Sequence, residues 1–449
     1  MTRSVGGEHS RFVQRTIAQN ALTTLAARLL GLGLALGTGV MTARLLGAAG
    51  RGLYSLAILC WTLGVLLLGL GIPTANAYQA SRKKHQLPLL ASNSFLLVLG
   101  IGCALAIAVA LFRRGFSHLP HGLEQLVPLL AILIPIGILT KAFAGIIQGQ
   151  NRIKTYNLVQ LISPTISLIT MGILVGFLRL GLAGALAAWG VGQIAAALVS
   201  SVVVVKSSGI SLTANGGLMI ECLVYGFQVC IMDLIGTLNL RFDMFLVAYF
   251  LGAESVGYYS VAILVADIVY FSPSAIATAS LPRLAGASTA AEARLIGDRG
   301  CRIALFSGIA SALVLGLASP IAVPAIYGAA FSPAVAPLLV LLPGVAVYGV
   351  AHITTAYFNG RVGKPWINAC IAALSLLLDV VFASFLIPRM GLVGAAIASS
   401  AAYTIAMLVN LGVYLFYSQS TIWNMLVITK VDFRSLANAA RDFAPFGER

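Results

Sequence analysis

Three basic residues stand in stretches of this sequence that are otherwise mostly apolar: Arg28, Lys141 and Arg241. A charged side chain at the centre of a bilayer costs at least about 2.5–3.5 kcal/mol on insertion scales, and a polar cavity is the usual reason for its presence. A guanidinium group can bind two phosphate oxygens at once, and a lysine ammonium group adds a point charge. These residue types therefore predict a cationic cavity that binds a pyrophosphate.

Four carboxylates and one histidine in similar stretches are candidates for coupling to an ion: Asp233, Asp243, Asp267, Asp379 and His352. The protonation of both residue types depends on their surroundings, so either can link a conformational change to a proton or Na⁺ gradient. Pairing with a neighbouring base explains each carboxylate equally well, and a packing hydrogen bond explains the histidine. The six cysteines lack metal-ligand spacing and indicate small buried side chains, so no metal site or cofactor is expected.

The elements that must position these residues are membrane-spanning helices. The chain has 449 residues, 59% of them hydrophobic and 9% charged, and a mean hydropathy of +0.97, whereas soluble domains carry about 25% charged residues. Its apolar stretches reach the roughly 20 residues that a helix needs to cross a bilayer. The pattern predicts an all-α polytopic membrane protein with twelve spans, near residues 19–42, 53–78, 88–112, 126–148, 157–178, 182–205, 222–248, 258–281, 303–327, 336–358, 366–387 and 392–417.

Two phrases occur twice in the chain. LGAAGRGLYSLAIL at 46–59 returns as LGAESVGYYSVAIL at 251–264, and RLGLAGALAA at 179–188 returns as RMGLVGAAIA at 389–398, at offsets of 205 and 210 residues. A similar offset relates Gly149 and Asn157 to Gly360 and Asn368. These echoes indicate a duplicated six-helix unit. Because six is even, the copies are parallel repeats, which in transporters enclose a central cavity and rock to expose it to either side.

The repeat relates ionisable positions in the two halves. Arg28 corresponds to Asp233, and Lys141 corresponds to His352. An ion pair between Arg28 and Asp233 is therefore an alternative to a cavity role. Arg241, which lies near the end of a predicted helix, could instead extend its charged end toward the membrane surface.

Each copy of the first phrase is expected to form a tight turn between two spans. Glycines allow the backbone angles that such a turn requires, and tyrosine side chains favour the membrane interface. The turn glycines would be Gly47, Gly52, Gly252 and Gly257, and the interfacial tyrosines Tyr54, Tyr258 and Tyr259.

The repeat and the charges also predict the domain organisation and orientation. Of the 28 Lys and Arg residues, nineteen fall in cytoplasmic segments and six in outer ones if both termini are cytoplasmic, as the positive-inside rule requires. The net charge of +15 is then explained by contact with the anionic lipids of the inner leaflet, and it does not indicate nucleic-acid binding. The expected parts are a cytoplasmic segment 1–18, a six-helix bundle 19–205, a linker 206–221, a second six-helix bundle 222–417, and a basic amphipathic tail 418–449 on the inner membrane surface, for which disorder is the alternative.

A set of short motifs resembles the multidrug/oligosaccharidyl-lipid/polysaccharide exporter superfamily, in its polysaccharide-transporter branch. The motifs are Ala43-Arg44-Leu45-Leu46-Gly47 before Gly52-x-Tyr54-Ser55, then Arg241-Phe242-Asp243, Leu281-Pro282, Tyr327-Gly328 and Ile387-Pro388-x-x-Gly391-x-x-Gly394-Ala395-Ala396. The resemblance covers about residues 12–417. The chain differs from lipid II flippases of the superfamily in having twelve expected helices rather than fourteen, and from many of its drug exporters in lacking an acidic residue on the first helix.

This resemblance implies a flippase that moves a polyprenyl-pyrophosphate-linked oligosaccharide across the bacterial cytoplasmic (inner) membrane by alternating access. Polysaccharide polymerases and other assembly proteins would be its partners, beside membrane lipids and H⁺ or Na⁺. A cation-coupled multidrug or metabolite exporter is the alternative, although cationic cavity charge disfavours cationic drugs. A membrane enzyme such as a polymerase or ligase is disfavoured, because the predicted outer loops are short and carry no carboxylate pair and no nucleophile–base arrangement.

Overall fold

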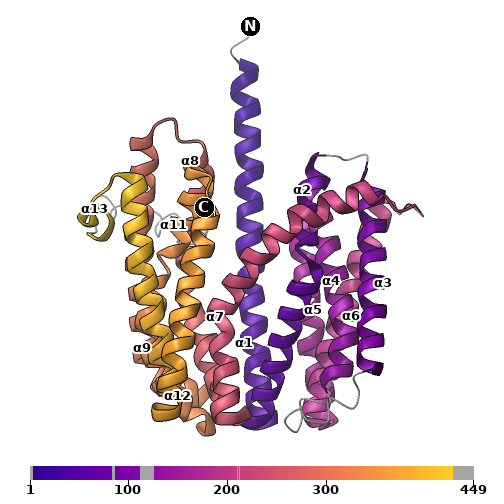
Figure 1. The fold of residues 1–449 in the computed structure, drawn as a ribbon, viewed down its shortest axis with the longest axis vertical. Coiled ribbons are helices and arrows are strands. Elements are labelled where there is room, and N and C mark those ends of the chain that lie inside the picture. Colours follow the sequence, from indigo (N-terminus) through magenta and orange to yellow (C-terminus); the bar gives the residue numbers. More distant parts are fainter. Residues whose placement is uncertain (1–3, 83–85, 112–125, 210, 212, 428–449) are drawn as a thin grey trace, which may run out of the picture. The chain divides into compact units, whose positions relative to one another are not determined.

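The structure is a computed structural model that describes residues 4–82, 86–111, 126–209, 211 and 213–427 and, of residues 4–22, the backbone alone. It divides into two compact units, Met1–Thr237 (unit 1) and Leu238–Arg449 (unit 2). The described residues of both units are almost entirely helical (Figure 1). Unit 1 contains α1 (Ser4–Gly69), α2 (Ile72–Arg82), α3 (Leu87–Leu111), α4 (Leu126–Gly149), α5 (Ile153–Met171), the π-helical η3 (Gly172–Phe177), α6 (Gly181–Ser208) and the first part of α7 (Gly216–Ala266).

Unit 2 contains the rest of α7 and the C-terminal elements. They are η4 (Asp267–Tyr270), α8 (Phe271–Ala285), α9 (Ala290–Tyr327), η5 (Ala329–Ala334), α10 (Val335–Tyr348), α11 (Ala351–Tyr357), η6 (Phe358–Val362), α12 (Trp366–Ser418) and α13 (Ile422–Leu426). Most of the expected cytoplasmic tail, residues 428–449, lies outside the described residues.

Nine helical segments of the described ranges are apolar and long enough to cross a membrane. Helices α1, α7 and α12 each contain one glycine with non-helical backbone angles: Gly47 (φ 68°, ψ −175°), Gly252 (φ 81°, ψ 178°) and Gly391 (φ 60°, ψ −138°). Each of these breaks lies where the sequence predicts a connection between two spans. The chain is therefore an all-α polytopic membrane protein, and nine segments with three breaks accommodate the twelve expected spans, a number that stays a prediction.

The sequence repeat is also a repeat of backbone conformation. Gly47 and Gly252 occupy equivalent positions in the two copies of the first phrase, and both adopt an angle pair that is essentially restricted to glycine. Gly181 and Gly391 are equivalent in the second phrase and have φ angles of 58° and 60°. The same residue therefore breaks the helix at the same place in both halves.

The turns differ from the expectation in their details. Gly52 and Gly257 are helical, because the single residues Gly47 and Gly252 are enough to reverse the chain. Tyr54 and its equivalent Tyr259 are buried within the protein, and their place at the membrane interface stays a prediction. Their rings pack among the helices that the turn brings together.

Arg51, which the sequence places in an outer loop, is buried beside the first break. Its Nη1 donates to the carbonyl oxygen of Gly39 and to Thr42 Oγ1, which lies 2.9 Å away. Both acceptors belong to the part of α1 before Gly47. The guanidinium group therefore ties the two sides of the break together.

A further break divides the predicted span 53–78. Leu70 and Gly71 have φ angles of 48° and 67°, and α2 begins at the next residue. Gly71 lies against Gly226 of α7, since a Cβ on Gly71 would come 2.0 Å from the Gly226 carbonyl oxygen. Small residues let membrane helices approach at the backbone, and this contact joins the start of α7 to unit 1.

Replacing Gly47 or Gly252 by alanine is expected to destabilise the protein by about 1–3 kcal/mol, because a Cβ is strained in this backbone region. The matched control is Gly33→Ala, since Gly33 is helical and a Cβ there meets nothing within 4 Å. That change should be neutral or stabilising by about 0.5–1 kcal/mol. Thermal unfolding of the purified variants measures both effects, and equal midpoints for all three variants would contradict the expected strain.

Candidate functional site

The ionisable residues predicted from the sequence fall into two sets. Arg28, Lys141 and Asp233 belong to unit 1, while the other five belong to unit 2: Arg241, Asp243, Asp267, Asp379 and His352. Each unit therefore presents its own group of charges. Among these eight residues, Arg28 and Lys141 of unit 1 form no ion pair with a described carboxylate, and the two buried carboxylates, Asp243 and Asp379, lie in unit 2.

Lys141 lies on the most buried span of unit 1 and is nevertheless exposed. Helix α4 packs against α2, α3 and α6, and the six residues after Lys141 are all buried. Gln148 is exposed about two turns further along, on the same face as Lys141. Ile132, which is 62% exposed, precedes Lys141 by two and a half turns and so lies on the opposite face. Helix α4 therefore has an exposed apolar face, which suits contact with lipid, and an exposed polar face on its opposite side.

Arg28 lies on a part of α1 that unit 1 covers poorly. Arg28, Leu29 and Leu30 are exposed in succession, and successive residues cover most of the circumference of a helix. One turn earlier, Thr24 accepts a hydrogen bond from Asn157 of α5 at 3.1 Å. Asp233 is also exposed, and no ion pair joins it to Arg28.

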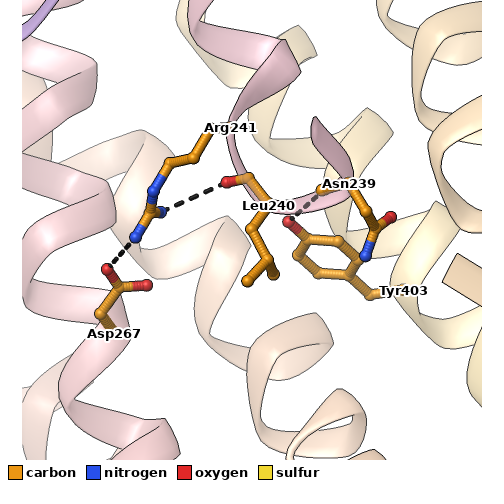
Figure 2. A network of polar contacts seen from close by, with 5 residues as sticks. All are labelled: Asn239, Leu240, Arg241, Asp267 and Tyr403. Atoms are coloured by element: carbon orange, nitrogen blue, oxygen red, sulfur yellow. Dashed lines mark hydrogen bonds and ion pairs between the residues drawn. The ribbon is translucent and has the colours of Figure 1, made fainter. Parts of the chain in front are cut away.

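Arg241 of α7 pairs with Asp267 of η4, as Figure 2 shows. The distance between Arg241 Nη2 and Asp267 Oδ2 is 2.5 Å, and the side chains are 30% and 31% exposed. Arg241 Nη1 also donates to the carbonyl oxygen of Leu240. The pair lines a cavity of about 20 Å³, room for about one water. A guanidinium group has five N–H donors, so this pairing leaves donors of Arg241 from which a water in the cavity could accept.

A group of aromatic side chains surrounds this ion pair. Asn239 donates to the Tyr348 hydroxyl at 3.0 Å. Figure 2 shows the second contact, in which Tyr403 donates to the Asn239 carbonyl oxygen at 3.3 Å. The rings of Tyr348 and Tyr403 stack with centroids 4.9 Å apart. Tyr270 lines the same cavity and meets the His352 ring edge-on at 5.5 Å. His352 therefore joins the group through aromatic packing.

Asp243 and Asp379 approach each other through one serine. Ser399 Oγ lies 2.9 Å from Asp379 Oδ1 and 3.3 Å from Asp243 Oδ2. The Tyr259 hydroxyl donates to Asp243 Oδ2 at 2.7 Å, and the Met244 amide donates to Asp243 Oδ1 at 2.8 Å. A serine has one hydroxyl hydrogen and can donate it to only one carboxylate at a time. We call Asp243, Asp379, Ser399 and Tyr259 the carboxylate pair site.

The buried oxygens without a hydrogen-bond partner among the described residues include Ser375 Oγ and Asn239 Oδ1. Each belongs to a residue one helical turn before a member of the pair, Ser375 before Asp379 and Asn239 before Asp243. Residues four apart share a helix face. The two carboxylates and the hydroxyls of Ser399 and Tyr259 form the type of oxygen-rich environment that a hard cation prefers.

The sequence pointed to both carboxylates but not to the residues that join them. Ser399 is one of many small residues of α12, and nothing local distinguishes it. The sequence did carry a signal for Tyr259, since the equivalent position of the first copy, Tyr54, is also a tyrosine. Position 38, the equivalent of Asp243, is a threonine, so the pair is a feature of the second half alone.

Removing one partner of the Arg241–Asp267 pair is expected to lower stability by about 1–2 kcal/mol, because the remaining charge loses its counter-ion and the site is partly exposed. Arg241→Ala and Asp267→Ala should both lower the thermal midpoint. The double exchange Arg241→Asp with Asp267→Arg should recover part of the loss. If the double exchange loses as much stability as the single changes Arg241→Asp and Asp267→Arg lose together, the two side chains do not stabilise each other.

The fold and the apolar helices define a polytopic membrane protein with charged groups in two units. The chain resembles an inward-facing multidrug resistance MATE family transporter of the MOP superfamily, with a TM-score of 0.68 at 15% identity over 95% of this chain and 100% of that one. An outward-facing MATE transporter gives a TM-score of 0.65 at 16% identity, covering 90% of this chain and 95% of that one. A MOP superfamily transporter from Pyrococcus furiosus gives 0.64 at 17% identity, with the same coverage. These similarities show the fold.

The sequence places the chain in a particular family of such transporters. Residues 17–287 match the family described as Polysaccharide biosynthesis protein, and the chain belongs to this family. A Shigella flexneri protein named "Putative O-antigen transporter" is 26% identical over 373 residues, which are 80% of this chain and 88% of that protein. The predicted membership of the polysaccharide exporter superfamily is confirmed.

Proposed function

We propose that this transporter is a flippase that moves a polyprenyl-pyrophosphate-linked oligosaccharide from the inner to the outer leaflet of the bacterial cytoplasmic membrane. Such movement would supply cell-surface polysaccharide synthesis, and both termini would be cytoplasmic. Polysaccharide polymerases and other assembly proteins would receive the product. The family and the O-antigen transporter relative support an oligosaccharide substrate rather than a drug.

The observation that carries this proposal is the exposed Lys141 on the polar face of α4. An ammonium group exposed at membrane depth needs water or an anion beside it, and the lipid-suited face of α4 is the opposite one. Arg28, also exposed, would supply a guanidinium group for the same anion. The Pyrococcus furiosus transporter, reported with "reverse polarity of binding pocket", is a precedent in this fold for a pocket of altered charge.

The carboxylate pair site of unit 2 would couple transport to a gradient of protons or Na⁺, which would drive it. Two ionised carboxylates joined by one hydroxyl repel each other, so a proton or a Na⁺ bound there lowers the energy of the pair. The ligand oxygens come from α7 and from both sides of Gly391 in α12. Movement of these helices during transport would change the affinity for the ion, which is the requirement for coupling.

Reconstitution tests the proposal directly. The purified protein is placed in vesicles that contain a fluorescent polyprenyl-pyrophosphate-linked oligosaccharide, and a quencher that cannot cross the membrane reports its movement. We expect transport of this lipid and none of the matched polyprenyl glycan that lacks the pyrophosphate. Equal transport of both lipids, or export of cationic dyes with no lipid movement, would favour the exporter alternative and refute the proposal.

A further inference from the structure

Unit 2 carries an apolar groove between the two arms of α12. It is lined by residues within 366–374 and 409–417 and has a volume of about 520 Å³. Trp366, Val409 and Phe416 on its walls are 58%, 41% and 73% exposed. None of the lining residues is charged, so the groove suits hydrocarbon rather than water.

The cationic side chain of Lys364 lies at one end of this groove. Lys364 precedes α12, and its Nζ lies 3.3 Å from the Tyr417 hydroxyl and 5.3 Å from the centre of the Tyr417 ring. Tyr417 itself lines the groove. An ammonium group has three N–H donors, so two of them remain for another acceptor.

The dimensions of the groove match one leaflet of a bilayer. Each arm contributes eight residue steps to the lining, which is about 12 Å at 1.5 Å per residue, and half of a hydrocarbon core is about 15 Å. The volume of about 520 Å³ leaves room for a stretch of acyl chain along this length. The exposed Trp366 lies at the end that carries Lys364, where interfacial indole rings are favoured.

We propose that this groove binds an anionic phospholipid, with one acyl chain along α12 and the phosphate against Lys364. The positive charge of Lys364 favours an anionic headgroup, and the length of the groove favours an acyl chain that ends within one leaflet. A polyprenyl chain is much longer than the groove and is not the occupant that these dimensions favour. The proposal requires only that the protein spans a membrane and does not depend on its substrate.

Two substitutions separate the headgroup from the chain. Lys364→Ala removes the cation and leaves the groove intact. Gly412→Phe fills the groove, because Gly412 lines it and a Cβ there meets nothing within 4 Å. The matched control is Gly100→Phe in a second apolar groove of about 550 Å³, in unit 1, where a Cβ also meets nothing within 4 Å and no lining residue is charged.

Binding is measured by native mass spectrometry of the full chain with dioleoyl phosphatidylglycerol or dioleoyl phosphatidylcholine. The wild type and Gly100→Phe should both bind phosphatidylglycerol at least about fivefold more tightly than they bind phosphatidylcholine, a difference of about 1 kcal/mol. Lys364→Ala should lose this preference, and Gly412→Phe should lose most of the binding. A photoreactive acyl chain should label peptides around 366–374 and 409–417.

Four results would overturn the proposal, three of them from the variants and the labelling. These three are an unchanged preference in Lys364→Ala, unchanged binding in Gly412→Phe, and labelling confined to other helices. Displacement of phosphatidylglycerol by an equal concentration of polyprenyl phosphate would also overturn it, because the groove would then belong to the isoprenoid chain.

Discussion

Replacing Lys141 by alanine is expected to abolish lipid movement while the protein remains folded in the membrane. Lys141 is exposed on a helix whose other faces are packed or apolar, so its removal leaves no packing defect. Losing one charge-assisted contact to a phosphate costs about 1.5–3 kcal/mol, or at least tenfold in affinity. Arg28→Ala should act in the same direction, since both residues would bind the same pyrophosphate.

The measurement is complementation of a strain that lacks the transporter, together with the vesicle assay. Lys141→Arg keeps the positive charge and should retain partial activity. The matched control is Lys154→Ala at the start of α5, an exposed lysine in a predicted cytoplasmic connection, which should complement fully. Full complementation by Lys141→Ala and Arg28→Ala at normal protein levels would reject a cavity role for these two residues.

Replacing Asp379 by asparagine is expected to make transport independent of the coupling ion. An amide at this position cannot exchange a proton and weakens a cation site, while it can still accept a hydrogen bond from Ser399. Asp243→Asn should have a similar effect, because the two carboxylates act as one site. In the wild type, we expect lipid movement to increase at least about tenfold under an inward Na⁺ or proton gradient, as a differential ion affinity of about 1.4 kcal/mol would produce.

Asp298→Asn is the matched control for the loss of a buried carboxylate in unit 2. Asp298 accepts hydrogen bonds from Tyr414 at 3.0 Å and Ser420 at 2.6 Å, away from the pair. This variant should lose stability but keep its ion dependence. A thermal midpoint that rises with NaCl and not with choline chloride identifies Na⁺ as the ion, since a ligand stabilises the state that binds it. The coupling role is wrong if transport by Asp379→Asn still responds to the gradient as the wild type does.

The class of protein and its internal repeat could be predicted from the sequence because both depend on local properties. Hydrophobic length alone specifies spanning helices, since the bilayer leaves no other partner for backbone polar groups. The breaks at Gly47 and Gly252 were also predictable, because the backbone angles there are ones that glycine readily adopts. The repeat identified these glycines, and the structure shows the same conformation at both.

Only the tertiary structure decided which of the ionisable residues meet. Asp243 and Asp379 are 136 positions apart, and the residue that joins them, Ser399, carries no local signal. Likewise, Arg241 pairs with Asp267 of η4, 26 positions further along the chain. The physical reason is that the lipid-facing and the packed faces of a membrane helix are both apolar. The pattern that shows which side of a soluble helix is buried is therefore weak here, and the orientation of each polar side chain follows from the packing of helices that are distant in the sequence.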